Sequence, residues 1–122
     1  MYDCIIIGAG PAGLEAASTC AGHGMKVLVI DEYMKAGGRL LGQLYEEPGG
    51  SWWNGIEESK KLFEKATNND AEMLLSTPVN DIENNNSLWT VYTENGTFQT
   101  KRLLLATGAS ESPIAVPGWT LP

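Results

Sequence analysis

Cysteine, histidine and basic residues are scarce in this 122-residue sequence, which has two cysteines, one histidine and eight lysines and arginines. With so few candidate ligands and no CxxC pair, the sequence argues against a metal ion and against a redox dithiol within this chain. Cys4 and Cys20 are expected to be small buried hydrophobic residues. His23 is expected to lie in the turn that ends a helix, not to act as a catalytic base.

Positive charge and long hydrophobic runs are also lacking. Fifteen acidic residues leave a net charge of −7, which argues against a basic face for nucleic acid. No apolar run approaches the roughly 18 residues that a membrane-spanning helix needs. The sequence enters its first apolar segment without the pattern of a signal peptide, so a cytoplasmic location is expected. Length and 43% apolar residues predict one globular domain over residues 1–122.

A glycine-rich motif follows the first apolar segment. Residues 2–7 lead directly into Gly8-Ala9-Gly10-Pro11-Ala12-Gly13, and a GxGxxG triplet between a strand and a helix is typical of dinucleotide-binding folds. In such a unit Gly8 permits the tight turn, Gly10 lets the backbone approach a pyrophosphate, and Gly13 lets the helix pack close to the strand. Free N–H groups at the start of the helix attract phosphate. The alternative is an ordinary strand–helix–strand unit.

A helix from about Leu14 separates this motif from a second predicted strand, residues 25–30, which ends in an acidic residue. Asp31 lies 18 positions after Gly13, close to the roughly 20-residue offset at which a carboxylate meets the ribose of a dinucleotide. A carboxylate repels a 2′-phosphate, so the bound adenosine is expected to lack one. Glu32 is the next candidate if the register differs by one residue. The alternative for Asp31 is a solvated strand end.

The remaining pattern predicts one more helix and five more strands. Residues 32–50 are rich in glycine and lack periodicity, so they are expected to form a functional loop. Ser51 is a candidate cap for a helix over 52–67. A type I′ turn is expected at Asn95-Gly96, because both residues tolerate positive φ. The strands are expected at 72–76, at 79–82, 88–93 and 97–101 as a small antiparallel meander, and at 102–106 as a fully buried strand.

The order of these segments resembles the N-terminal FAD-binding segment of flavoproteins with two dinucleotide-binding domains. This class includes thioredoxin reductase and the pyridine nucleotide-disulfide oxidoreductases. The resemblance rests on GAGPAG at 8–13 paired with LLLATGA at 103–109, and it covers essentially the whole chain. It implies an α/β, Rossmann-like three-layer fold with a parallel sheet and a small antiparallel meander. Residues 106–113 and 117–122 look most like the large subunits of amino-acid and opine dehydrogenases, to which the alpha subunit of sarcosine oxidase is related.

The resemblance assigns cofactor contacts to several segments. Asp31 and Glu32 are expected at the adenosine ribose, and the backbone of Val79 at the adenine, with a plain core residue as the alternative for Val79. The glycine motif is expected to hold the pyrophosphate, and the Ala-Thr-Gly turn to pass close to the cofactor. The residues concerned are Gly8, Gly10, Pro11, Ala12, Gly13, Ala106, Thr107 and Gly108.

The loop after the second strand carries further expected contacts. Gly38 and Arg39 match the family's Gly-Gly-Gln/Arg loop over the pyrophosphate and ribityl chain, where Arg39 would bond to phosphate. Gln43 is another candidate on this loop. The alternatives are a solvated cation at Arg39 and a surface residue at Gln43. The absence of cysteine from residues 32–50 excludes the glutathione-reductase type, and no catalytic or metal-binding residue is assigned.

Two parts of the resembling proteins are expected to be missing from this chain. They continue into an NAD(P)-binding domain, where the thioredoxin-reductase type carries its cysteine pair, and then return to complete the FAD domain. The chain is therefore expected to be a truncated FAD-binding domain. Strand edges and apolar patches left uncovered predict that it self-associates.

The leading hypothesis is the FAD-binding portion of an FAD-dependent oxidoreductase, with hydride transfer between the flavin and a small amine or amino acid, or NAD(P)H. The whole protein is expected to use FAD and NAD(P)H, whereas the chain alone is expected to bind cofactor weakly and to lack turnover. One alternative is a non-catalytic dinucleotide-binding fragment, and another is a thioredoxin-reductase-like NAD(P)H-dependent reductase. A plain Rossmann NAD dehydrogenase fits less well, because such folds continue with alternating strands and helices.

Overall fold

A four-stranded parallel sheet lies at the centre of the computed structural model, which describes residues 1–38, 44–46 and 52–107. In order across the sheet, its strands are β5 (Glu72–Leu74), β2 (Val27–Ile30), β1 (Cys4–Ile7) and β9 (Leu103–Leu105). The central strands β1 and β2 are buried on both faces, with the side chain of β1's last residue only half-buried. This burial explains why both strands are continuous apolar runs in the sequence.

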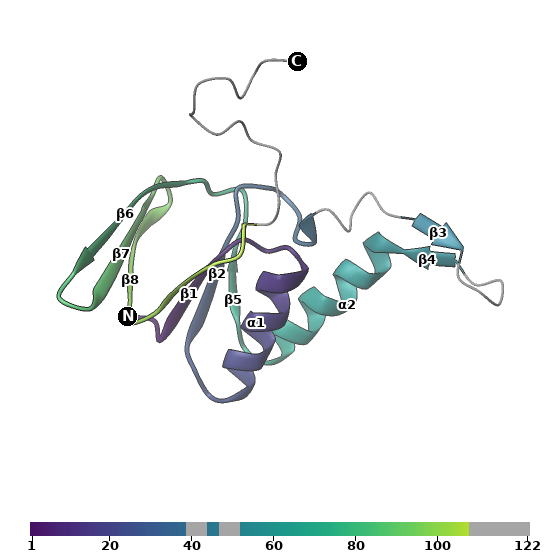
Figure 1. Cartoon of the computed structure of the whole chain (residues 1–122), viewed down its shortest axis with the longest axis horizontal. Helices are drawn as coiled ribbons and strands as arrows, with labels where there is room; N and C mark the ends of the chain where they lie inside the picture. The colour runs from purple at the N-terminus through teal and green to yellow at the C-terminus, as the bar shows by residue number, and fades with distance from the viewer. Residues whose placement is uncertain (39–43, 47–51, 108–122) are drawn as a thin grey trace, which may run out of the picture.

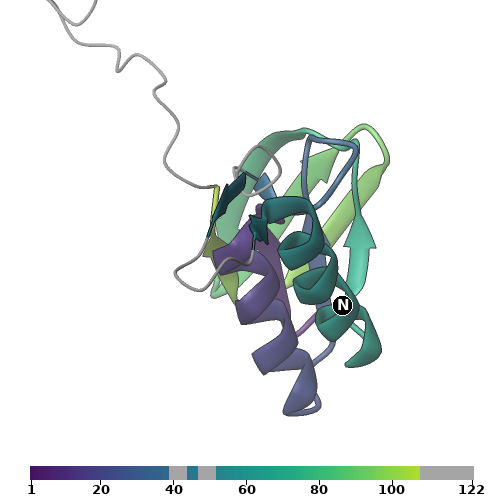
Figure 2. The ribbon, with the colours of Figure 1, turned by 90° about the vertical axis from the view of Figure 1, so that its right-hand side faces the viewer.

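Two helices cover one face of this sheet (Figures 1 and 2). α1 (Pro11–Gly22) begins three residues earlier than predicted, because the fixed φ of proline suits the first helical position. It ends at the C-cap His23, as predicted for this histidine. α2 (Gly55–Asn68) packs beside α1, and Asn69 Nδ2 donates hydrogen bonds to the carbonyl oxygen and Oγ of Ser18 at 3.2 and 3.1 Å.

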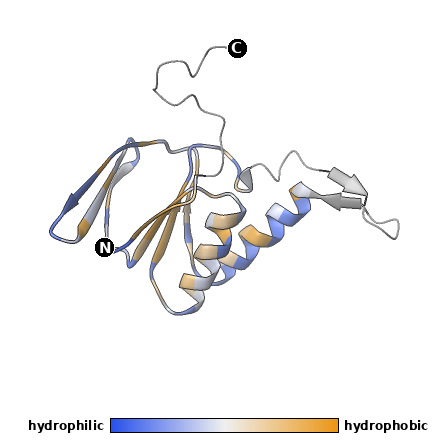
Figure 3. Ribbon diagram, in the orientation of Figure 1, coloured by the Kyte–Doolittle hydropathy of each residue, from blue (hydrophilic) through white to orange (hydrophobic). Residues whose placement is uncertain are grey.

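The core between the helices and the sheet is strongly apolar, whereas α2 has a polar outer side (Figure 3). Both free cysteines pack in this core, as predicted. Cys4 is buried, and this burial raises the pKa of its thiol. Cys20 is half-buried on α1. The fully buried members of the core are Ile6, Ala9, Leu14, Ala17, Val27, Val29 and Ala66.

A three-stranded antiparallel meander lies on the other side of the sheet (Figure 1). It consists of β6 (Val79–Asn85), β7 (Leu88–Thr93) and β8 (Gly96–Thr100). Val91 of β7 and Phe98 of β8 pack against the alternate side chains of β1 and β2, namely Ile5, Leu28 and Ile30. Helices, parallel sheet and meander form three layers, so the predicted fold class is confirmed.

A short hairpin stands where a loop and the start of a helix were predicted. β3 (Leu44–Glu46) pairs antiparallel with β4 (Trp52–Asn54). The prediction that residues 32–50 lack strands and that the helix begins at 52 was therefore wrong. Two adjacent tryptophans are favourable in a strand. Their pairing with β3 leaves no mark in the helical periodicity from which the helix was predicted. The predicted cap Ser51 lies outside the described residues.

The two hairpin turns of the meander differ from the prediction. β6 continues to Asn85, and the turn consists of Asn86 and Ser87, both with positive φ, at 52° and 69°. In the second turn Thr93 pairs with Gly96, so Glu94-Asn95 forms the turn and only Gly96 has positive φ. The expected type I′ turn at Asn95-Gly96 is thus wrong. Positive φ at both central residues, which that turn requires, occurs at Asn86-Ser87 instead.

The last described strand was predicted to be fully buried, and this prediction was wrong. Leu104 is 41% and Leu105 is 63% exposed on β9, which is an edge strand within the described part of the chain. A run of leucines indicates that both faces of the strand are apolar, but it does not show whether another element of the fold covers those faces. Within the described ranges, no helix is long and apolar enough to cross a membrane.

Candidate functional site

A cleft of about 1080 Å³ opens where the parallel strands end. The carboxyl ends of β1, β2 and β9 meet there with the glycine turn, the loop that follows β2, and the start of β6. Open α/β sheets bind their ligands outside the carboxyl ends of the strands. The predicted site residues that line this cleft are Gly8, Gly10, Pro11, Asp31, Glu32, Gly38, Val79, Ala106 and Thr107.

Backbone crowding requires glycine at two positions of the turn. Gly8 has a φ of +116°, and a Cβ there would lie 2.1 Å from the carbonyl oxygen of Ala106. A Cβ on Gly13 would lie 1.9 Å from the carbonyl oxygen of Gly8. Any larger residue would push β9 or α1 away from the turn. The structure therefore has the tight turn at Gly8 and the close helix packing at Gly13 that the motif predicts.

The N-terminus of α1 has no side-chain cap at this cleft. Its N-cap is Gly10, and its first turn contains no acidic residue. Pro11 has no N–H, so the unpaired donors of the first turn belong to Ala12 and Gly13. A Cβ on Gly10 would meet only the Cα of Gly38, at 3.9 Å, so the backbone here is open to a ligand. These donors and the positive end of the helix dipole suit a phosphate group.

The carboxylate of Asp31 lies at the end of β2, beside this turn. Its Oδ2 accepts a hydrogen bond from the N–H of Ala9 at 2.6 Å, and its Oδ1 accepts one from the N–H of Tyr33 at 2.8 Å. Because an ionised carboxylate has about four acceptor positions, both oxygens can still bond to a ribose hydroxyl. Glu32 beside it is exposed and lines the same cleft.

The loop after β2 folds back onto the glycine turn. The N–H of Gly37 donates to the carbonyl oxygen of Ala9 at 2.6 Å. Gly38 has a φ of +55°, and a Cβ there would lie 3.1 Å from the Cα of Gly10. Two glycine-rich segments far apart in the sequence therefore touch along their backbones, directly beside the start of α1.

One wall of the cleft is mostly apolar. Val79 and Ile82 of β6 line it, and Leu105 contributes from β9. The buried Thr77 fixes this wall to the sheet, because its N–H donates to the carbonyl oxygen of Asp31 at 2.9 Å and its Oγ1 accepts from Asn95 Nδ2 at 2.7 Å. An apolar wall with a few polar groups suits a planar heterocycle.

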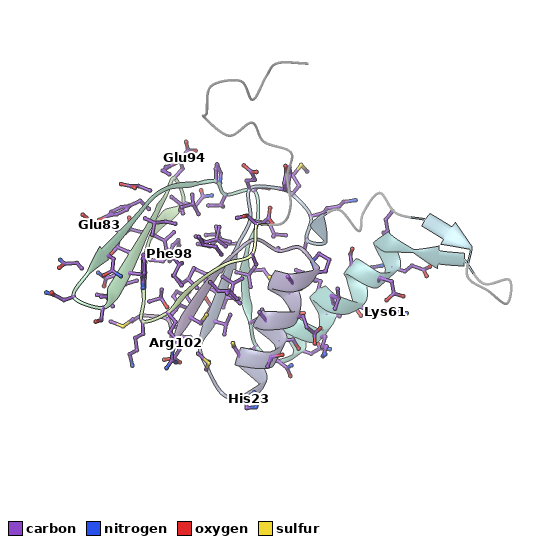
Figure 4. All side chains as sticks on the ribbon, in the orientation of Figure 1. His23, Lys61, Glu83, Glu94, Phe98 and Arg102 are labelled. Atoms are coloured by element: carbon purple, nitrogen blue, oxygen red, sulfur yellow. The ribbon has the colours of Figure 1, made fainter. Side chains whose placement is uncertain are left out.

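Some predicted site residues are not brought to the cleft surface. Ala12 and Gly13 lie in the first turn of α1 but not among the residues that line the cleft. Arg39, Gln43 and Gly108 lie outside the described residues. His23 is at the end of α1 away from the glycine turn (Figure 4).

Sequence reasoning also missed residues of the cleft. Tyr33, Met34 and Lys35 line it from the loop after β2, and Tyr33 and Met34 are 64% and 80% exposed. A signal was available, because these residues lie between the acidic strand end and the Gly-Gly pair, both of which are expected at the cofactor. Thr77 was missed although it closely follows a parallel strand, where sites of such sheets form.

An uncapped helix N-terminus, a strand-end carboxylate and an apolar wall in one cleft define a dinucleotide-binding α/β domain. The sequence model of the family "Pyridine nucleotide-disulphide oxidoreductase" matches residues 2–121. The chain belongs to this family. The resemblance predicted from the motifs is thereby confirmed, and FAD and NAD(P)H are the cofactors of this family's members.

Individual relatives agree with this membership. An opine oxidase subunit of Rhizobium meliloti is 34% identical over the whole chain, which spans 28% of that relative. Thioredoxin reductase of Treponema pallidum is 31% identical over 96% of the chain, which spans 38% of its length. Among solved structures, thioredoxin reductase of Lactococcus lactis superposes with a TM-score of 0.81 at 33% identity, over 97% of this chain and 39% of that one.

Proposed function

We propose that the cleft binds the adenosine diphosphate part of FAD, and that this chain is the FAD-binding part of an FAD-dependent oxidoreductase. The observation that carries the proposal is the uncapped start of α1 at Gly10, which shares one cleft with the carboxylate of Asp31. A bound flavin supplies the hydride chemistry in such enzymes. The chain's own residues bind and orient the nucleotide, and none of them is assigned a catalytic role.

The diphosphate lies over Gly10 in this proposal, where the N–H groups of Ala12 and Gly13 donate to it. The ribose lies at Asp31, with Glu32 beside it, and the adenine lies against the wall that includes Val79. The charge of the diphosphate is balanced by nearby cations, and Lys35 lines the cleft. The other proposed contacts are Gly8, Pro11, Gly38, Arg39, Gln43, Ala106, Thr107 and Gly108.

The reaction proposed for the whole protein is hydride transfer between the flavin and a small amine or amino acid. The Rhizobium meliloti opine oxidase, similar over the full chain, supports this substrate class. A second candidate is an NAD(P)H-dependent reductase, supported by the 33% identity to Lactococcus lactis thioredoxin reductase. Since the chain spans 28% of the first relative, we propose that residues 1–122 form the first part of the FAD domain. We also propose that the whole protein is cytoplasmic. The NAD(P) domain and returning segment would complete it.

Equilibrium dialysis of the chain against FAD, FMN and ADP tests the nucleotide assignment. FMN lacks the adenosine and its phosphate, so the proposal expects FAD and ADP to bind and to compete, and FMN to bind at least tenfold more weakly. NAD, which shares the adenosine diphosphate part, is expected to bind no more tightly than FAD. Asn69→Ala is the matched control, because Asn69 bonds to Ser18 between the helices and its loss leaves the cleft intact.

Three results would count against the proposal. Binding of FMN as tight as that of FAD would place the flavin, not the adenosine, in the cleft. Binding of NAD but not of FAD would favour a plain nicotinamide domain. Absence of binding by all four nucleotides at millimolar concentration would remove the dinucleotide assignment of this cleft.

A further inference from the structure

Ala9, in the middle of the glycine turn, is hydrogen-bonded through both its N–H and its carbonyl oxygen. Its N–H donates to Asp31 Oδ2 at 2.6 Å, and its carbonyl oxygen accepts from the N–H of Gly37 at 2.6 Å. Ala9 is fully buried, at 0% exposure. A buried N–H without a partner is costly, so this donor depends on the Asp31 carboxylate.

Asp31 is itself held in place through its main chain. Its N–H donates to the carbonyl oxygen of Leu74 at 3.0 Å, and its carbonyl oxygen accepts from the N–H of Thr77 at 2.9 Å. Its Oδ1 meanwhile accepts from Tyr33. The residue is thus fixed to β5, to the segment before β6 and to its own loop, which makes its carboxylate a rigid support for the turn.

We propose that Asp31 is a positioning residue for the diphosphate, which acts by holding the glycine turn through Ala9 whether or not it also bonds to the ribose. This inference rests on the proposed function. The bond from the Ala9 N–H to Asp31 fixes the turn directly before the start of α1, where the free N–H groups of Ala12 and Gly13 follow. Donors that are already oriented bind a ligand more tightly, because less ordering is needed on binding.

The inference predicts that Asp31 affects the affinity even of ligands that lack the ribose hydroxyl groups. A residue that only bonds to the ribose loses its effect when the ribose hydroxyl groups are removed. A residue that shapes the turn keeps its effect, since the diphosphate still binds there. The affinities for ADP and for 2′,3′-dideoxy-ADP, each measured with and without a substitution at Asp31, therefore separate a ribose-bonding role from a turn-shaping role. The logic is that of a double-mutant cycle.

Asp31→Asn is the test variant, because it keeps the shape of the side chain and replaces one acceptor oxygen with an NH₂ donor. It is expected to weaken dideoxy-ADP about tenfold, as fits the loss of one charge-assisted hydrogen bond, and to weaken ADP by at least the same factor. Asp3→Asn is the matched control, an identical chemical change at a carboxylate that also accepts a backbone N–H bond, from Lys26, but does not line the cleft. It is expected to leave dideoxy-ADP binding within about twofold of the unaltered chain.

A second measurement reads the turn without ligand. Hydrogen exchange of the Ala9 amide is expected to be at least tenfold faster in Asp31→Asn than in Asp3→Asn. Asn69→Ala, which weakens the contact between the helices, controls for general destabilisation. Equal Ala9 exchange in the two Asp→Asn variants, or normal dideoxy-ADP binding by Asp31→Asn, would overturn the inference. If the unaltered chain binds neither ligand, the proposed function fails, and the exchange experiment still decides the role of Asp31.

Discussion

Alanine at two glycines of the same turn is expected to have opposite effects. Gly13→Ala should destabilise the fold, whereas Gly10→Ala should leave the fold stable and block the nucleotide. A Cβ at Gly13 would lie 1.9 Å from the carbonyl oxygen of Gly8, but a Cβ at Gly10 would have its nearest neighbour at 3.9 Å. The two substitutions add the same methyl group three residues apart, so each is the other's control.

The cost of Gly13→Ala follows from that short distance. The turn and α1 must separate by more than roughly 1 Å, because ordinary contacts begin near 3.4 Å. Overpacking of this kind costs about 1–3 kcal/mol, and often more against backbone. Alanine regains at most about 1 kcal/mol through its helix propensity. The net loss is about 2 kcal/mol, a large share of the roughly 5–15 kcal/mol of a typical domain.

The cost of Gly10→Ala is small by the same reasoning. Gly10 has φ −78° and ψ −173°, an extended conformation that alanine adopts without strain. Alanine is the poorer N-cap by a few tenths of a kcal/mol, and the loss of chain freedom in the unfolded state offsets this by about 0.4–1 kcal/mol. The new methyl group, however, stands where the diphosphate is proposed to approach the backbone. ADP affinity should fall at least tenfold.

Urea unfolding and ADP dialysis of both variants check this prediction. With an m-value of about 2 kcal/mol/M, Gly13→Ala should lower the unfolding midpoint by about 1 M at unchanged m, and Gly10→Ala by less than about 0.3 M. A Gly13→Ala midpoint equal to that of the unaltered chain would refute the packing argument. Normal ADP binding by Gly10→Ala would refute the position of the diphosphate.

Three further predictions follow from other parts of the chain. Lys35→Gln should weaken ADP by about two- to fivefold but leave adenosine binding unchanged, and equal effects on both would contradict a phosphate role. Burial and the hydrogen bond to Glu72 raise the pKa of Tyr2 to about 12, so its stabilising contribution is complete below pH 10 and lost as the pH rises through 12. Tyr2→Phe should remove that alkaline transition from the tyrosinate absorbance titration. Leu104→Lys should reduce the proposed self-association in sedimentation at tens of micromolar, since Leu104 is exposed on the edge strand β9; an unaltered chain that is purely monomeric would contradict it.

The sequence predicted the first strand, first helix and second strand because their signals are local. The apolar runs and the glycine motif are adjacent in the sequence, so these elements can be predicted without knowing which distant residues they contact. The β3–β4 hairpin was missed because Trp52 belongs to a strand only through its pairing with Glu46. The burial of β9 was wrong for a related reason, because exposure of Leu105 depends on what lies beside the strand.

The site was predicted where the residue type alone indicates its role. Gly8 is required by the backbone geometry of the turn, whereas Gly10 and Asp31 were singled out for the close approach of a pyrophosphate and for charge, and all three line the cleft. Lys35 was missed because its position depends on how the loop after β2 is folded. That folding is set by bonds such as Ser76 N–H to the carbonyl oxygen of Tyr33, at 2.8 Å, which no local pattern reveals.

The double attachment of Ala9 limits how the length of the chain can vary. The segment from Asp31 to Gly37 begins and ends on hydrogen bonds to one residue, Ala9, so an inserted or deleted residue between them would break one of the two bonds. Tags, grafted loops or circular-permutation sites introduced into this domain would therefore be accepted more readily at the exposed hairpin turn of Asn86 and Ser87 than within this segment.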